Sequence, residues 1–229
     1  MGTFVLVHGA WGGSHVWHLV SPLLRAAGHE VFTPTLTGLG ERVHLMSPAV
    51  NLTTHITDVC NTLYFEDLSE VVLVGHSYGG KVISGAMEHA AERVKHLVFV
   101  DAFLPTGGEP LTDRVVTTED WLVPPAPPRD LPDRKEQVWI TERRRPHPRS
   151  CFSDLVHLSR PLEEHDCGLT YIKATADQSE NAQQRRSTFW QAADLVRTNP
   201  RWRYREIATS HWVQSEQPAE LVQLLSEAV

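Results

Sequence analysis

Residues 70–82 read EVVLVGHSYGGKV. The aliphatic run at the start of this stretch predicts a buried strand, and the amphipathic pattern that follows predicts a helix over residues 78–92. Between the two lies G-x-S-x-G, the pattern of a nucleophile elbow, in which a serine occupies a strained turn with its hydroxyl exposed. Gly75 and Gly79 would let the strand and the helix approach closely around Ser77. The stretch therefore predicts that Ser77 is a nucleophile, and a serine that only caps the following helix is the structural alternative.

Outward from the elbow, segments that resemble buried strands alternate with segments of helical periodicity. Strands are expected at residues 4–8, 30–34, 71–75, 96–101, 169–175 and 203–207, and helices at residues 16–27, 53–63, 78–92, 181–198 and 218–228. Gly28 is expected to end the first helix, Asn51 to cap the second, and Pro218 to begin the last. This alternation predicts an α/β fold with a doubly wound, mainly parallel sheet of about six strands. Active sites in such sheets lie at the carboxyl ends of the strands.

A proline-rich stretch interrupts the alternation between the fourth and fifth strands, and ten prolines between residues 105 and 161 argue against long helices there. We expect residues 1–104 and 167–229 to form the core, and residues 105–166 to form a cap insertion over the active site. The apolar side chains of the cap would either line a pocket roof or pack the cap onto the core. The run from Arg143 to Arg145 is expected to be a solvated face, with attraction of an anionic substrate group as the functional alternative.

Composition limits the classes of partner. A net charge of −7 and a pI near 6.0 give no electrostatic reason to expect nucleic acid as a partner, because its binding needs a basic face. The sequence has no membrane-length apolar run and starts without a leader pattern, and its three cysteines show no ligand spacing, so a cytoplasmic protein with reduced thiols is expected. The thirteen histidines are scattered without a metal-binding pair, so no metal is expected. A homodimer is a possibility from general frequency alone.

A serine hydroxyl needs an adjacent base, and the base needs an orienting acid. In sheets of this kind the triad runs serine, acid, histidine along the chain, so the base is expected in the loop after the last strand. His211 lies in that loop and is predicted to be the general base. Asp177, at the end of the fifth strand, is the first choice for the acid. Asp101, at the end of the fourth strand, is the alternative, and Glu180 is a third candidate.

An oxyanion hole needs two preset backbone donors. The N–H of Tyr78, directly after the nucleophile, is expected to be one, and that of Ala10, in the glycine-rich loop after the first strand, to be the other. His8 is expected to support this loop through hydrogen bonds. The loop lacks both G-x-G-x-x-G and a G-K-S/T sequence, so no nucleotide cofactor is expected, and cofactors of other kinds are not implied.

Taken together, these motifs resemble the α/β-hydrolase superfamily, and within it the group of hydroxynitrile lyases, plant methyl esterases and bacterial pyrethroid-hydrolase-like carboxylesterases. The motifs that carry the resemblance span nearly the whole chain: HGAW at residues 8–11, GHSYGG at 75–80, VDAF at 100–103, YI at 171–172 with Asp177, and TSH at 209–211. The resemblance implies the α/β-hydrolase fold, Ser77, Asp177 and His211 as the triad, and Ala10 and Tyr78 as oxyanion donors. One departure is the separation of 34 residues between Asp177 and His211, a few more than the group suggests, which keeps Asp101 open.

Within that group, lyases carry a threonine in the oxyanion loop, an acidic residue before the nucleophile and a lysine after the catalytic histidine. This chain has Gly9, His76 and Trp212 at those places. The expected function is therefore a cofactor-free serine carboxylic ester hydrolase that forms an acyl-enzyme on a small or medium hydrophobic ester or lactone. The alternatives are a lyase or lactone-forming cyclase with the same triad, and a non-catalytic ligand receptor. The candidate substrate contacts are Trp11, Tyr78, Phe103, Trp121 and Trp212.

Overall fold

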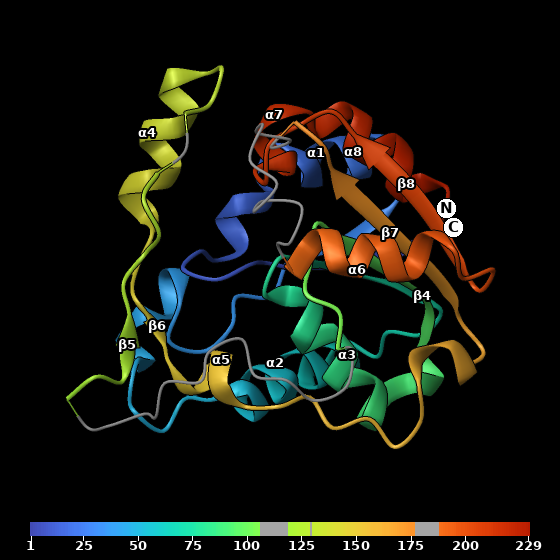
Figure 1. Ribbon diagram of the computed structural model, residues 1–229, viewed down its shortest axis with the longest axis horizontal. Coiled ribbons are helices and arrows are strands. Elements are labelled where there is room, and N and C mark those ends of the chain that lie inside the picture. Colours follow the sequence, from blue (N-terminus) through green and yellow to red (C-terminus); the bar gives the residue numbers. More distant parts are fainter. Residues whose placement is uncertain (106–118, 129, 177–187) are drawn as a thin grey trace.

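A single parallel sheet organises the chain, as the computed structural model in Figure 1 shows. The structure describes residues 1–105, 119–128, 130–176 and 188–229. Six parallel strands lie in the order β2-β1-β3-β4-β7-β8. They are β1 (Thr3–Val7), β2 (Glu30–Phe32), β3 (Val71–His76), β4 (Val94–Val100), β7 (Gly168–Ala174) and β8 (Trp202–Ile207). The predicted α/β fold with six mainly parallel strands is confirmed.

The strand that precedes Ser77 lies between β1 and β4, near the middle of the sheet. All six of its residues are buried. Continuous burial is expected of a parallel strand with helices on both faces, and it explains why the sequence is an unbroken aliphatic run. The carboxyl ends of β1, β3, β4, β7 and β8 therefore lie along one edge, where the loops that follow them can meet.

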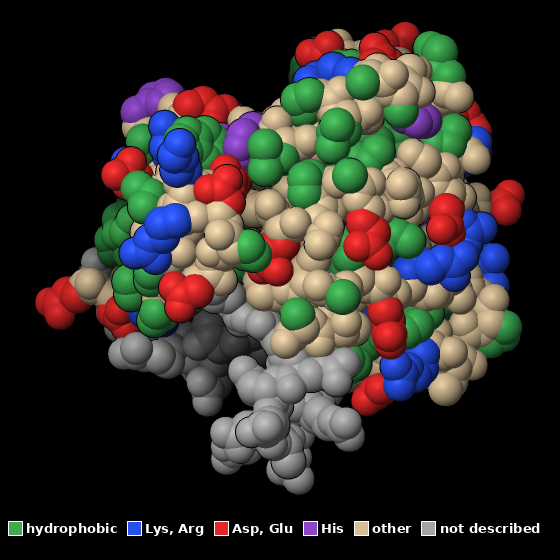
Figure 2. Space-filling model, turned by 90° about the horizontal axis from the view of Figure 1, so that it is seen from above, with side chains coloured by type: hydrophobic (Ala, Val, Ile, Leu, Met, Phe, Trp, Pro, Cys, Tyr) green, Lys and Arg blue, Asp and Glu red, His purple; other side chains and the backbone are tan. Residues whose placement is uncertain are grey.

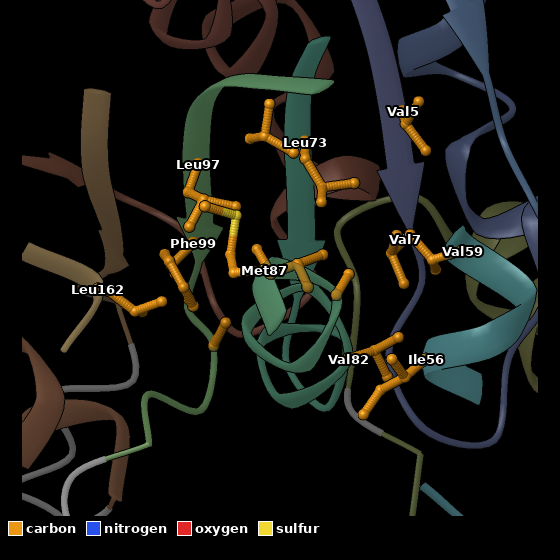
Figure 3. Close-up of a cluster of buried hydrophobic side chains, with 14 of the residues drawn as sticks. Val5, Val7, Ile56, Val59, Leu73, Val82, Met87, Leu97, Phe99 and Leu162 are labelled. Atoms are coloured by element: carbon orange, nitrogen blue, oxygen red, sulfur yellow. The ribbon is translucent and has the colours of Figure 1, made fainter. Parts of the chain in front are cut away.

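Helices cover both faces of the sheet, and alternate residues of each strand face one layer or the other. The bounds are α1 (Val20–Ala26), α2 (Leu52–Phe65), α3 (Gly79–Ala90), α6 (Thr188–Arg197), α7 (Val213–Glu216) and α8 (Pro218–Ser226). The side chains of α2, α3 and α6 pack with Val5, Leu73 and Phe99 in one core cluster, part of which Figure 3 shows. The side chains of α1 and α8 pack with Phe4, Leu6 and others on the opposite face.

The predicted helix at residues 16–27 is divided in the structure. A 3-10 turn, η1 (Ser14–Trp17), comes first, and α1 begins only at Val20. Pro22 explains the break, because it has no N–H for a bond to residue 18 and its ring would clash with that carbonyl. The end of α1 agrees with the prediction: Gly28 has a φ of 85°, which glycine adopts without strain, and the N–H of His29 returns to the carbonyl of Leu24.

Between β4 and β7 the chain leaves the sheet. Its described elements are β5 (Leu122–Val123), α4 (Arg134–Arg143), β6 (His147–Pro148), α5 (Ser150–Ser153) and the short turn η4 (Leu162–Glu164). Two other short turns, η2 (Gly40–Leu45) and η3 (Ala91–Arg93), lie earlier in the chain. In Figure 1, α4 stands apart from the sheet and is joined to the rest through β5 and β6, which pair antiparallel. Its side chains nevertheless contact the core, because Glu136 pairs with His18 at 3.2 Å and accepts a hydrogen bond from Ser215 at 3.0 Å.

The surface visible in Figure 2 carries charged side chains of both signs. Figure 2 shows lysine and arginine side chains interspersed with aspartates and glutamates on the visible face. Within the described ranges, no helix combines the length and the apolar character that crossing a bilayer requires.

The capping box at the start of α2 gives a test of local stability. Asn51 accepts a hydrogen bond from the N–H of Thr54 at 2.9 Å, and the hydroxyl of Thr54 accepts one from the N–H of Asn51. We expect Asn51→Ala to lower the free energy of unfolding by about 1 kcal/mol, since it leaves a helix N–H without its acceptor. Urea unfolding followed by circular dichroism would measure this. Asn51→Asp keeps the acceptor and should stay near the wild-type value, whereas equal losses in both variants would contradict this account of the cap.

Candidate active site

Ser77 occupies the turn between β3 and α3 in a left-handed conformation, with a φ of 54°. Such a conformation costs a non-glycine residue of order 1 kcal/mol or more and persists only where the surroundings enforce it. Here the surrounding contacts are tight: a Cβ on Gly75 would lie 2.7 Å from the carbonyl carbon of Gly79, and one on Gly79 would lie 2.7 Å from the carbonyl oxygen of Val7. The close approach predicted for these two glycines is therefore present.

A chain of short hydrogen bonds begins at the hydroxyl of Ser77. His211, in the loop after β8, has its Nε2 at 2.9 Å from the Oγ of Ser77. The Nδ1 of the same ring lies 2.6 Å from Oδ2 of Asp101, which directly follows β4. An ionised carboxylate can only accept, so Nδ1 carries a proton and Nε2 presents its lone pair to the serine hydroxyl. That is the arrangement in which an imidazole can take a proton from serine.

A buried lysine contacts the other oxygen of the same carboxylate. Lys173 on β7 donates to Oδ1 of Asp101 at 2.6 Å and to the carbonyl of Ala174 at 2.7 Å, and its ammonium lies 4.5 Å from the ring centre of Trp190. Both side chains of the pair are 3% exposed. Burial alone would raise the pKa of Asp101, but the hydrogen bond from His211 and the charges of His211 and Lys173 outweigh it and lower that pKa to about 2. Asp101 is therefore ionised at neutral pH.

Asp177, the first choice for the acid, lies outside the described residues. The carboxylate that the structure brings to His211 is the alternative, Asp101. The sheet order explains why Asp101 can reach this point: β4 is the neighbour of β3, the N–H of Ser77 donates to the carbonyl of Val100, and the N–H of Phe103 donates to the carbonyl of Ser77. Glu180 also lies outside the described residues.

Two further side chains hold the loop that carries His211, and sequence reasoning gave neither this role. His76 donates from Nε2 to the carbonyl of His211 at 2.9 Å, and the two rings lie 4.7 Å apart. Burial lowers the pKa of His76 to about 3, so it acts as a neutral donor. Glu216 accepts hydrogen bonds from both the N–H and the hydroxyl of Ser210, directly before His211. The position of the imidazole is thus set by contacts on both sides of its own residue.

The loop after β1 also lies at this edge. The N–H of Leu36 donates to Nε2 of His8 at 3.1 Å, so the proton of that ring is on Nδ1, from which it donates to the carbonyl of Gly9 at 2.8 Å. This is the supporting role predicted for His8, whose pKa burial lowers to about 3. The predicted oxyanion donors are the N–H groups of Ala10 and Tyr78. Neither amide has a hydrogen-bond acceptor within the described part of the chain, so both remain able to bind a developing oxyanion.

A cavity of about 210 Å³ opens onto Ser77 and His211. Its described lining is mainly apolar and comes from the β1 loop, the cap, α6 and the β8 loop; it includes Ala10, Trp11, Val16, Ala126, Pro127, Ile140, Phe189 and Trp212, together with Arg144 and Gln214. Trp11 and Trp212, two of the predicted substrate contacts, are therefore in the wall. Phe189, which sequence reasoning missed, lies parallel to the His211 ring at 4.7 Å.

Three other predicted contacts do not belong to the described wall. The Tyr78 side chain is fully buried, and its hydroxyl lies 2.9 Å from Nδ1 of His55, so only its backbone faces the reaction. Phe103 packs behind the wall, with its ring 4.7 Å from Phe189. Trp121 precedes β5, and its carbonyl accepts from the N–H of Arg149 at 2.7 Å, which fixes it within the cap. For these residues, position near a motif or within the cap was not enough to predict a pocket contact.

Comparison with known proteins agrees with this architecture. A family described as "Alpha/beta hydrolase family" matches residues 4–224. The chain belongs to the alpha/beta hydrolase family. It is 50% identical over 111 residues to a carbendazim hydrolyzing esterase of Nocardioides sp. (strain SG-4G), covering 48% of this chain and 46% of that protein. It is 39% identical over 114 residues to methylesterase 1 of Arabidopsis thaliana, covering 44% and 40%.

The structural comparison covers the chain from end to end. An extracellular alpha/beta-hydrolase from a Paenibacillus species, described as sharing homology with tobacco salicylic acid binding protein 2, superposes with a TM-score of 0.80. The match covers 100% of this chain and 99% of the other, at 22% identity, and therefore supports the fold. By sequence, the chain matches less than half the length of the curated relatives named above.

This alpha/beta hydrolase also contains a buried group of His55, His147 and Cys151, whose ligand-type atoms lie within 4.8 Å of one another. The hydrogen bonds do not fit metal binding. The N–H of Trp11 donates to Nδ1 of His147 at 3.3 Å, so in the neutral ring the proton is on Nε2, which leaves that atom without a lone pair for an ion. Burial raises the pKa of Cys151 to about 12, because removing the thiolate from water disfavours the charged form. The group is better explained as core packing beneath the β1 loop.

The depressed pKa of Asp101 has a consequence for acid stability. Because the folded value of about 2 lies below the ordinary value of 3.8, ionisation of Asp101 stabilises the fold above about pH 4, and this contribution is lost as pH falls toward 2. The shift corresponds to roughly 2 kcal/mol. Asp101→Asn cannot titrate, so its free energy of unfolding should fall less steeply between pH 4 and pH 2 than that of the wild type. Urea titrations at several pH values would compare the slopes, and identical slopes would show that Asp101 does not titrate as described.

Proposed function

We propose that this protein is a serine carboxylic ester hydrolase that acts on a small or medium hydrophobic ester or lactone through an acyl-enzyme. The observation that carries the proposal is the continuous hydrogen-bonded chain from Ser77 through His211 to Asp101, with contacts of 2.9 and 2.6 Å. Similarity to an esterase and a methylesterase over part of the chain supports the same reaction class. The small, mainly apolar cavity supports a substrate of modest size.

In the proposed reaction the Oγ of Ser77 attacks the ester carbonyl while His211 Nε2 takes its proton. The carbonyl oxygen becomes an oxyanion that the N–H groups of Ala10 and Tyr78 bind. His211 then returns the proton to the leaving alkoxide, so that an alcohol departs and the acyl group remains on Ser77. In the second half of the reaction, His211 takes a proton from water as the water attacks the acyl carbonyl. The proton then passes to the Oγ of Ser77, which releases a carboxylic acid and restores the serine.

We propose Asp101 as the acid of the triad. It is ionised, it accepts the Nδ1 proton, and it is held on its other oxygen by Lys173. A carboxylate in this place fixes the tautomer of the ring and stabilises the imidazolium that forms when the proton is transferred. Lys173 does not touch the reacting atoms and is a positioning residue, since it orients the carboxylate and offsets part of the cost of burying it.

The first test concerns the nucleophile. Ser77→Ala should lower kcat on 4-nitrophenyl esters by about a million-fold, the loss seen when the nucleophile of a serine triad is removed. Labelling by a fluorophosphonate probe should occur in the wild type and disappear in Ser77→Ala. Circular dichroism of the variant would check that the fold is intact. A wild-type protein that is neither labelled nor active on a panel of aliphatic, aryl and lactone substrates would leave a ligand receptor as the better function.

The second test distinguishes the two carboxylates. Asp101→Asn should lower kcat by about ten-thousand-fold, because the amide can hold the imidazole in the wrong tautomer. Asp177→Asn is the matched control and should change kcat by less than about tenfold. The reverse result, with a large loss in Asp177→Asn alone, would assign the acid to Asp177 and reduce Asp101 to a structural role.

We also propose a cytoplasmic location. The three cysteines, Cys60, Cys151 and Cys167, are free thiols, which is the usual state of cysteine in a reducing compartment.

A further inference from the structure

Arg144 brings a permanent positive charge to the wall of the catalytic cavity. It follows α4 in the cap and is half-buried, and the described residues around it in the wall are mostly apolar. Its two neighbours in the sequence differ from it. Arg143 is exposed and stacks on Trp139 at 4.1 Å, while Arg145 is exposed and donates to the carbonyls of Glu142 and Arg144. Only the middle residue of this run is among the lining residues that the structure describes.

Two aromatic side chains hold the guanidinium. It lies 5.3 Å from the ring centre of Trp11 and 5.5 Å from that of Trp212. These tryptophans follow Ala10 and His211 directly, so the arginine is anchored to the loops that carry an oxyanion donor and the general base. One amino group donates to the carbonyl of Ala126 at 2.7 Å. Cation–π contact and this single bond fix where the charge lies but do not neutralise it.

The charge of Arg144 has no carboxylate partner in the described part of the chain. Partial burial lowers its pKa from the ordinary value, because removing the guanidinium from water disfavours the charged form, yet arginine stays charged at any physiological pH. A guanidinium carries five N–H donors in a planar fork that matches a carboxylate. A partly desolvated charge without a counter-ion, placed in a substrate cavity, would gain from an anion that enters with the substrate.

Long-range electrostatic attraction would not bring an anionic substrate to this cavity. The net charge of −7 repels anions at a distance, and salt screens that repulsion beyond about 8 Å under physiological conditions. Selection for an anion would therefore arise inside the cavity, through direct contact with the guanidinium. Sequence analysis gave attraction of an anionic substrate group as a possible role of residues 143–145. Of these three side chains, only Arg144 is among the described lining residues of the cavity, so only it could contact such a group there.

We propose that Arg144 binds a carboxylate carried by the substrate, so that the preferred substrates are esters with a second, ionised carboxyl group apart from the reacting carbonyl, such as monoesters of short dicarboxylic acids. This inference rests on the proposed esterase function and amends its substrate class: the acyl chain stays small and apolar next to the reacting carbonyl but also carries a charged carboxylate. Arg144 would be a specificity residue, since it contacts a part of the substrate that does not react.

A matched pair of substrates tests the proposal. The monoanionic 4-nitrophenyl hydrogen glutarate and the neutral 4-nitrophenyl 5-methylhexanoate have the same shape, with a carboxylate in one and an isopropyl group in the other. The readout is the ratio of kcat/KM for the anionic ester to that for the neutral ester, measured for each protein. Arg144→Met should lower this ratio by about 10- to 100-fold, the range expected for loss of a hydrogen bond to a charged group. Arg144→Lys keeps the charge, so its ratio should lie between those of the wild type and Arg144→Met. Arg143→Met should have the wild-type ratio.

Binding without turnover gives a second measurement. Glutarate should bind Ser77→Ala in isothermal calorimetry at least about tenfold more tightly than it binds the double variant Ser77→Ala with Arg144→Met. Its affinity should also fall as salt rises. This comparison does not depend on catalysis.

The outcomes separate the two proposals. If wild type hydrolyses the neutral ester and Arg144→Met leaves the ratio unchanged, the substrate class is wrong while the esterase function stands. If Arg144→Met lowers kcat/KM equally for both esters, Arg144 is a structural link between cap and core, and the anion proposal is overturned. If wild type hydrolyses neither ester and a fluorophosphonate does not label Ser77, both proposals fail.

Discussion

The site depends on a carboxylate that stays ionised while almost fully buried. An isolated carboxylate in that position would take up a proton. A protonated carboxyl group can donate as well as accept, so it would no longer fix which nitrogen of the imidazole carries the proton. Asp101 avoids this because Lys173 contacts one oxygen and His211 the other. Lys173 lies on β7, and His211 lies in the loop after the neighbouring strand β8, which His76 and Glu216 hold in place. The orientation of the imidazole toward Ser77 follows from this arrangement.

Three of the five described non-glycine residues with a positive φ lie at the carboxyl edge of the sheet, and the other two, Asp67 and Glu70, precede β3. Ser77, Asp101 and Trp11 all have positive φ values, of 54°, 40° and 65°, although none of them is glycine. Each lies directly after a strand or in the loop that follows one, where the chain must turn sharply to bring a group toward the cavity. Hydrogen bonds from neighbouring strands hold these turns, such as that from the N–H of Asp101 to the carbonyl of Ile172 at 2.7 Å. Because the neighbouring strands hold these strained turns, the side chains of Ser77 and Asp101 keep fixed positions at the cavity.

The sequence predicted the sheet, the elbow and the base because each depends on short-range patterns. A buried aliphatic run, two glycines around a serine and a histidine after the last strand need little knowledge of the rest of the fold. The acid was harder, because Asp101 and Asp177 both follow neighbouring strands and local sequence does not distinguish their reach. One signal was available: Lys173 lies within a buried strand pattern, and a buried lysine requires an acidic partner nearby. The cap was least predictable. Side chains such as Trp121 and Arg144 are placed by contacts with residues distant in the sequence, and a local hydrophobic pattern does not reveal such contacts.

The cap and the oxyanion loop are joined through Trp11. Its N–H donates to His147, its carbonyl accepts from the N–H of Arg145 at 3.0 Å, and its indole donates to the carbonyl of Val123 at 3.1 Å. Three hydrogen bonds thus fix the residue after Ala10 relative to β5 and β6. The guanidinium of Arg144 lies beside the same indole. The segment that carries Arg144 thus also fixes the backbone beside Ala10, so the proposed substrate contact and the proposed oxyanion donor share one set of structural contacts.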